Sequence, residues 1–122
     1  MPRLSQSLRH RDASESSLIR ACLAWLTLHK VLAFRINTGG AYYEKKDQRP
    51  QFVRFAFVGC PDIHGTLPNG RSLYIETKRH PRKPTWAQIQ FLARAEQNRA
   101  LVGVIYTVDE LIELVTPALR AG

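Results

Sequence analysis

Two acidic residues and a lysine near the middle of the chain have the types and spacing of a cation-assisted hydrolytic site. Asp62 follows a proline in GCPDIHG, and Glu76 and Lys78 stand two apart in YIETK. Between them lies Pro68-Asn69-Gly70, a strong turn signal flanked by β-forming residues. The segment 59–78 is therefore predicted to fold as a β-hairpin.

The hairpin determines which side chains share a face. Asp62 and Glu76 lie equally far from Asn69 along the chain, so a symmetric antiparallel hairpin places them opposite each other. Lys78 shares the face of Glu76 because the two are two apart on one strand. Thr77 is expected to point the other way, with its backbone carbonyl still in reach of the site. Two carboxylates and one ammonium group are thus predicted to converge.

This combination of groups favours binding of a divalent cation. Neighbouring carboxylates repel each other and do not both ionise at low cost, whereas a cation removes that repulsion. Oxygen ligands favour Mg²⁺, Mn²⁺ or Ca²⁺, and a lysine alongside can orient or deprotonate water or stabilise charge on a phosphate. The competing interpretation is an incidental Glu76–Lys78 ion pair on a surface hairpin. A bare ExK string favours that alternative, but PD, a turn and ExK at hairpin spacing favour a catalytic site.

Two further polar residues each have two interpretations. Glu15 leans toward the apolar face of the first predicted helix and could supply another carboxylate, but Asp12-x-x-Glu15 is also a capping box. Gln88 could bind a phosphate or a water at the site, but Thr85-x-x-Gln88 is a capping box as well. Thr107-x-x-Glu110 is a third such box without a functional use, so spacing alone leaves both residues open.

The predicted elements form a layered α/β domain in the order α-β-β-β-α-β-α. Residues 1–11 are expected to be a flexible basic arm, and residues 12–122 a single domain. We expect helices from about Asp12, at 85–97 and from Thr107, and extended segments at 31–37, 52–65, 72–78 and 101–106. The polar segment 41–51 is expected to be a charged loop.

Composition favours a polyanionic partner. Lys and Arg total 18 against 10 acidic residues, and the net charge of +8 suits nucleic acid better than a membrane surface, since no basic amphipathic helix or lipidation signal is present. Improved solubility is the simpler alternative. No apolar run is long enough for a membrane span and no signal-peptide core follows the N-terminus, so a cytoplasmic location is expected. Cys22 and Cys60 are expected to be core residues without zinc-type spacing.

The segments GCPDIHG, YIETK and TWAQIQFL, with ESSLIRACLAWL and FRINTGG upstream, resemble the virus-type replication-repair nuclease (VRR-NUC) domains of the PD-(D/E)xK superfamily. The resemblance covers about Glu15 to Val108. It implies a restriction-endonuclease-like core, a mixed central sheet flanked by helices. It also implies that Asp62, Glu76 and the Thr77 carbonyl bind Mg²⁺ or Mn²⁺, with Glu15 as a further acidic residue. Lys78 would then be the catalytic lysine and Gln88 the motif glutamine.

The same resemblance implies a structure-selective DNA endonuclease of phage or bacterial DNA repair. The expected substrate is branched DNA such as a Holliday junction, cut by a homodimer without a small-molecule cofactor or a membrane. The alternatives are a non-catalytic DNA-binding module of the same fold, or a nuclease acting on flaps, nicked duplex or RNA. Tyr42, Tyr43 and Trp86, if exposed, would form a dimer face or stack on unpaired bases. The expected DNA-binding residues are Arg35, Asn37, Lys45, Lys46, Arg49, Arg79, Arg82 and Lys83.

Overall fold

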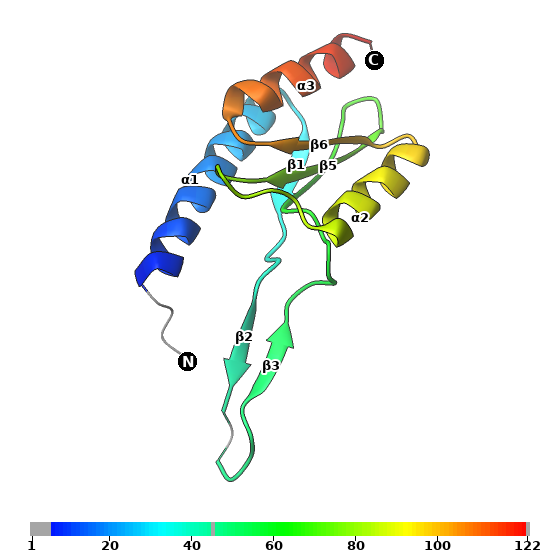
Figure 1. The fold of residues 1–122 in the computed structure, drawn as a ribbon. Helices are drawn as coiled ribbons and strands as arrows, with labels where there is room; N and C mark the ends of the chain where they lie inside the picture. Colours follow the sequence, from blue (N-terminus) through cyan, green and yellow to red (C-terminus); the bar gives the residue numbers. More distant parts are fainter. Residues whose placement is uncertain (1–5, 45, 122) are drawn as a thin grey trace.

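The computed structural model describes residues 6–44 and 46–121, which form a mixed α/β fold (Figure 1). Its elements in chain order are α1 (Gln6–Leu28), β1 (Leu32–Arg35), β2 (Gly40–Tyr43), β3 (Gln51–Arg54), β4 (Ile63–Thr66), β5 (Ser72–Thr77), α2 (Trp86–Gln97), β6 (Leu101–Ile105) and α3 (Val108–Ala121). The predicted α/β class is confirmed, and the second and third helices lie where they were expected. Among the described helices, none combines the length and apolar character that crossing a bilayer requires.

Four strands form the central sheet, in the order β1-β4-β5-β6. The first three are antiparallel neighbours, and β5 and β6 run parallel, so the sheet is mixed as expected. The helices α1 and α3 pack on one face, where the largest group of buried side chains lies: Leu18, Ile19, Cys22, Leu26, Ile63, Leu73, Ile75, Ile105, Leu111 and Val115. The helix α2 packs on the opposite face, where the Phe91 ring meets the edge of Tyr74.

The central hairpin has the predicted register. Ile63 pairs with Ile75 and Thr66 with Ser72, so each pair is centred on Asn69. The Gly70 N–H donates to the Leu67 carbonyl, and the Leu67 N–H donates to the Arg71 carbonyl, which closes a three-residue turn. Glycine suits position 70 because the turn requires a positive φ, here 91°.

The segment 41–51, expected to be a loop, instead forms most of a second hairpin. Strands β2 and β3 pair with each other in a separate two-stranded sheet, with Tyr42 opposite Phe52. Figure 1 shows this hairpin extending away from the central sheet. The expected extended segment 52–65 is also wrong in part, because β3 ends at Arg54 and bends and turns fill 55–60. Five strands therefore precede α2, where three extended segments were expected.

The first helix begins earlier than predicted. Since α1 starts at Gln6, residues 6–11 belong to a helix and not to the expected arm, while residues 1–5 lie outside the described residues. Asp12 consequently stands inside the helix, and the capping-box interpretation of Asp12-x-x-Glu15 is wrong.

Gly59 and Gly70 have nearly equal positive φ angles and differ in the space around them. Replacing each by alanine therefore tests how closely the segment before Asp62 approaches α2. Gly59 (φ 90°) precedes the Asp62 segment, and a Cβ there would lie 2.6 Å from the Ala87 carbonyl oxygen in α2, whereas a Cβ at Gly70 (φ 91°) would meet nothing within 4 Å. We expect Gly70→Ala to lower the free energy of unfolding by about 1–2 kcal/mol, from backbone strain alone. Gly59→Ala should lower it by about 1–3 kcal/mol more, from the added backbone clash. Urea unfolding measures both, and equal losses would contradict the close approach of α2.

Candidate functional site

The predicted site residues meet at the open end of the β4–β5 hairpin. Asp62 lies directly before β4, Glu76 is in β5, and Lys78 follows that strand. Glu76 is 2% exposed and Lys78 is 6% exposed, which is unusual for charged side chains that lack a full set of partners. The Lys78 ammonium lies 3.8 Å from Glu76 Oε1. This is a buried pair, which argues against the incidental surface ion pair.

Asp62 is held by three donated hydrogen bonds. Its Oδ2 accepts from the Thr77 N–H at 2.9 Å and from the Thr77 hydroxyl at 2.7 Å, while Oδ1 accepts from the Thr38 hydroxyl at 3.1 Å. The carboxylate thus binds a backbone donor of the neighbouring strand at the point where the ladder ends. These bonds fix its orientation.

The expectation for Thr77 needs a correction. Its side chain was expected to point away from the site, but its hydroxyl is one of the groups that hold Asp62. Thr38 was not singled out from the sequence at all. The pairing of β1 with β4 brings it there, because Ile36 donates its N–H to the Asp62 carbonyl at 2.8 Å and Thr38 follows two residues later.

Glu76 has one oxygen with partners and one without. Its Oε1 accepts from the Gln88 side-chain amide at 2.9 Å and faces Lys78. Its Oε2 is buried and has no hydrogen-bond partner in the described part of the chain. A buried carboxylate oxygen without a donor is costly, so the position suits either a proton or a cation.

The protonation of Glu76 follows from this environment. Burial, and next the negative charge of Asp62, raise the pKa of Glu76 from 4.5 to about 9, although the Lys78 ammonium partly opposes the shift. Without a cation, Glu76 is therefore protonated at neutral pH, as expected for one of two crowded carboxyl groups.

Gln88 caps α2, and the same side chain also contacts the site. Its side-chain oxygen accepts from the Thr85 N–H at 2.8 Å, and the Thr85 hydroxyl accepts from the Gln88 N–H at 3.2 Å, so a capping box begins α2. The amide nitrogen of the same side chain donates to Glu76. The cap thereby fixes the amide that holds the buried acid. In contrast, the corresponding contacts of Thr107 and Glu110 only begin α3.

Glu15 lies at the edge of the site. Its negative charge makes the smallest of the contributions that raise the pKa of Glu76, so it is near but not adjacent. Its Oε1 accepts from Arg82 Nη1 at 3.0 Å. Glu15 is thus engaged in an ion pair that links α1 to the segment after Lys78.

The residues present fit a divalent cation held by few protein ligands. Among the described residues, no three or more His, Cys, Asp or Glu side chains form a metal-binding group. Asp62 and Glu76 remain as a pair of carboxylates with an oxygen that lacks a donor. Mg²⁺ is commonly bound by one or two carboxylates plus water and substrate phosphate, so a pair is sufficient.

Four of the expected DNA-binding residues lie on exposed surface, in β1, in the segment that follows it and in the loop of the β2–β3 hairpin. Arg35 donates to the Ser16 hydroxyl at 3.2 Å, and the Asn37 side chain accepts from the Gly39 N–H. Lys46 and Arg49 are exposed in the loop that joins β2 to β3. Lys45 lies outside the described residues.

The three expected DNA-binding residues after β5 differ in accessibility. Lys83 is exposed, but Arg82 is committed to Glu15. Arg79 is half-buried, and its positive charge is close enough to the buried Cys22 to lower the pKa of that thiol. Burial outweighs this effect and raises the pKa of Cys22 to about 11, so Cys22 is the core residue that was expected.

Cys60 is buried, as expected, but its position beside the site next to His64 was not anticipated. Cys60 Sγ lies 3.6 Å from His64 Nε2. Burial, then the charges of Glu76 and Asp62, raise the pKa of Cys60, and burial lowers the pKa of His64. Both groups are therefore neutral at pH 7, and Cys60 is not activated as a nucleophile.

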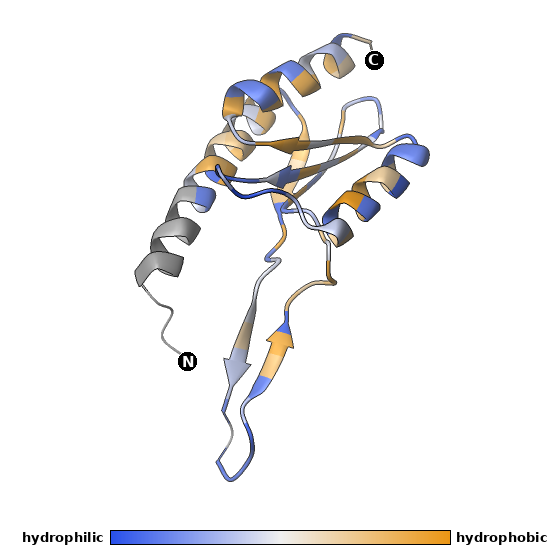
Figure 2. Cartoon of the chain, viewed as in Figure 1, coloured by the Kyte–Doolittle hydropathy of each residue, from blue (hydrophilic) through white to orange (hydrophobic). Residues whose placement is uncertain are grey.

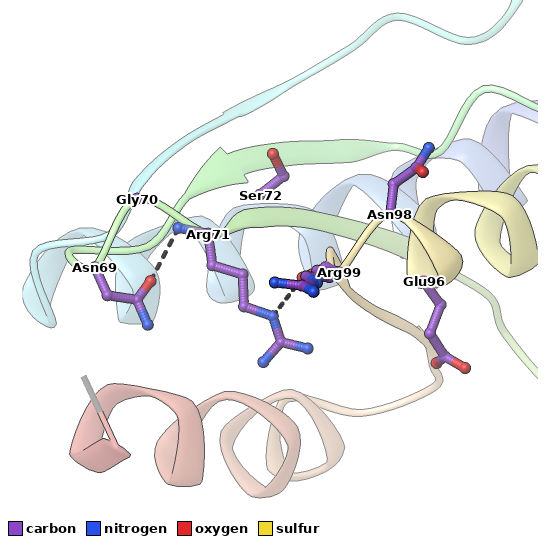
Figure 3. A pocket seen from close by; sticks show the side chains of 7 residues that line it. All are labelled: Asn69, Gly70, Arg71, Ser72, Glu96, Asn98 and Arg99. Atoms are coloured by element: carbon purple, nitrogen blue, oxygen red, sulfur yellow. Dashed lines mark hydrogen bonds between the residues drawn. The ribbon is translucent and has the colours of Figure 1, made fainter.

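A hollow of about 780 Å³ lies at the other end of the hairpin (Figure 3). Its lining residues are Asn69, Gly70, Arg71, Ser72, Glu96, Asn98 and Arg99. The Arg71 guanidinium there donates to the Arg99 carbonyl at 2.7 Å and ties the turn to the loop before β6. None of the predicted site residues lines it.

No protein-family model matches the chain, and no curated protein matches it significantly. The interpretation of the site therefore rests on its own geometry.

The raised pKa of Glu76 predicts how stability depends on pH. Between 4.5 and about 9 the folded metal-free protein retains a proton that the unfolded chain releases, so stability falls as pH rises. The slope should approach about 1.4 kcal/mol per pH unit from this group. Glu76→Gln should flatten the decline, as measured by urea unfolding across this range without metal. An unchanged slope in the variant would show that Glu76 is not the group responsible.

The hydroxyl of Thr77 should matter for cation binding. Thr77→Val keeps the shape but removes the bond that orients Asp62, so the Mn²⁺ concentration for half-maximal thermal stabilisation should rise about 10- to 100-fold. Thr77→Ser restores the hydroxyl and should restore affinity. If valine binds Mn²⁺ as well as threonine does, the hydroxyl does not position Asp62.

Proposed function

We propose that the protein is a metal-dependent DNA endonuclease of the PD-(D/E)xK type, related to the VRR-NUC domains. The observation that carries the proposal is the buried Glu76 oxygen without a donor, next to an oriented Asp62 and a buried Lys78. This arrangement is supported by the mixed sheet, in which the acids lie at one end of an antiparallel hairpin.

Asp62 and Glu76 would hold Mg²⁺ or Mn²⁺, which supplies Lewis acidity to the scissile phosphate and to an attacking water. Asp62 enters this role already oriented by Thr77 and Thr38. Glu76 must give up its proton, and Gln88 then continues to hold its Oε1. Lys78, 3.8 Å from Glu76, would donate to the attacking water or to the phosphoryl oxygen on which charge develops.

DNA is the proposed substrate because of charge. The net charge of +8 and the exposed Arg35, Lys46, Arg49 and Lys83 suit a phosphate backbone, whose contacts give affinity without sequence preference. Selectivity would then come from DNA shape. A homodimer that cuts branched DNA such as a Holliday junction is the form that we propose, in line with the family resemblance.

The test is cleavage of a labelled panel of four-way junction, flap, nicked duplex, linear duplex, single strand and RNA, with Mg²⁺ or Mn²⁺. We expect metal-dependent cleavage of branched DNA, reduced about 100-fold or more by Lys78→Met or Asp62→Asn. Lys30→Met is the matched control, because Lys30 is exposed beside the end of β1 that pairs with Thr66, far from Asp62.

Three outcomes would contradict the proposal, the last of them only its preference for branched DNA. Binding of DNA without cleavage of any substrate would indicate the non-catalytic module. Cleavage that survives in both site variants would place the chemistry elsewhere. Equal cleavage of linear duplex and junction would remove the selectivity for branched DNA and leave a general nuclease.

A further inference from the structure

The β2–β3 hairpin has little support from the core. Its strands pair with each other and not with the central sheet, and of their eight residues only Ala41 is half-buried while the others are exposed. Figure 1 shows the hairpin standing clear of the helices and the sheet. An isolated two-stranded hairpin is only marginally stable in water. Its sequence therefore serves something other than packing of this domain.

One face of the hairpin presents two aromatic rings and a guanidinium. Tyr42 and Phe52 are cross-strand partners whose ring centroids are 5.0 Å apart, and the Arg54 guanidinium lies 5.5 Å from the centre of the Phe52 ring. Gly40 completes this face, since a Cβ there would lie 2.5 Å from the Phe52 ring. The glycine allows Phe52 to lie flat across β2. About half of the surface of Tyr42 (53%) and Phe52 (47%) is open to contact.

The base of the β2–β3 hairpin lies next to the proposed metal site. Thr38, which donates to Asp62, is two residues before β2, and the Phe55 N–H donates to the Gly39 carbonyl at the base of the hairpin. Tyr42 is four residues beyond Thr38, so this face lies up to about 13 Å along the chain from the threonine that donates to Asp62. That reach is well within one turn of duplex DNA, about 34 Å.

Charge favours a nucleic acid over another protein surface. The hairpin carries Lys46, Arg49 and Arg54 around its apolar strand, and Figure 2 shows a hydrophilic connecting loop next to the hydrophobic β3. A two-fold contact through this face would bring the Lys46, Arg49 and Arg54 of a second copy against these same cations. Aromatic rings beside cations are the usual platform for unpaired bases.

We propose that the Tyr42–Phe52–Arg54 face binds unpaired bases of the DNA substrate by stacking, while the acids bind the scissile phosphate. The inference rests on the proposed function and deepens it. It adds a feature of the branched substrate, namely bases that are unpaired near the branch, for which a flap serves as the probe. The arm thereby selects such substrates over intact duplex.

The experiment measures binding, independently of cleavage, by fluorescence anisotropy with the full chain in a Lys78→Met background with Mg²⁺. The probes are a labelled flap and a linear duplex of the same sequence. Tyr42→Ala with Phe52→Ala should weaken flap binding about 10- to 100-fold and change duplex binding less than about twofold. Tyr43→Ala is the matched control, since Tyr43 lies on the other face with similar exposure (45%), and it should change neither affinity by more than about twofold.

Folding is checked by circular dichroism and thermal melting, which should match those of the Lys78→Met parent because the mutated side chains lie outside the core. The inference is overturned if the double variant binds the flap as tightly as the parent, if flap and duplex affinities fall together, or if the parent does not bind the flap. It is also overturned if the double variant turns a dimer into a monomer while each chain binds the flap as before, because the face is then a self-association surface. Failure of the proposed function shows differently, as absence of metal-dependent cleavage across the substrate panel.

Discussion

Glu76 and Asp62 are neighbouring acidic side chains, and little water reaches Glu76. The repulsion between their carboxyl groups is the constraint on which the rest of the site depends. The carboxyl of Glu76 is 2% exposed and retains a proton well above the usual range because of burial and the charge of Asp62. Lys78 reduces the penalty only in part, at 3.8 Å from one oxygen. The second oxygen has no donor among the described residues. A divalent cation would satisfy that oxygen and remove the repulsion together, which is why the arrangement indicates metal chemistry.

Several elements hold these charges in place. The three donated bonds to Asp62 come from β5 and from the segment after β1, and the amide that holds Glu76 belongs to the first turn of α2. The same Gln88 side chain caps α2, so helix position and carboxyl position are coupled. The apolar core beneath, with Ile63, Leu73 and Ile75 fully buried, fixes the hairpin against α1 and α3. Small displacements of any of these elements would separate the acids.

The β4–β5 hairpin was predicted well because the residues that determine it are neighbours in the sequence. A Pro-Asn-Gly turn and the alternation around it were enough to set the register that pairs Ile63 with Ile75. The role of Thr38 could not be foreseen, since it depends on β1 pairing with β4 across more than twenty residues. The hairpin in 40–54 was missed because its connecting loop is dense in charge and its strands are short and lack a buried face, so no periodic apolar signal marks them. The early start of α1 was missed for a similar reason, as its first residues are polar and basic.

The central claim is that a divalent cation takes the place of the proton that Glu76 retains beside Asp62. Titration of Mn²⁺ into the protein by calorimetry, at neutral pH and in two buffers of different ionisation enthalpy, tests it directly. The account predicts saturable Mn²⁺ binding that releases about one proton, and loss of both binding and proton release in Glu76→Gln. Mn²⁺ binding that Glu76→Gln leaves unchanged, or no binding with or without DNA, would contradict it.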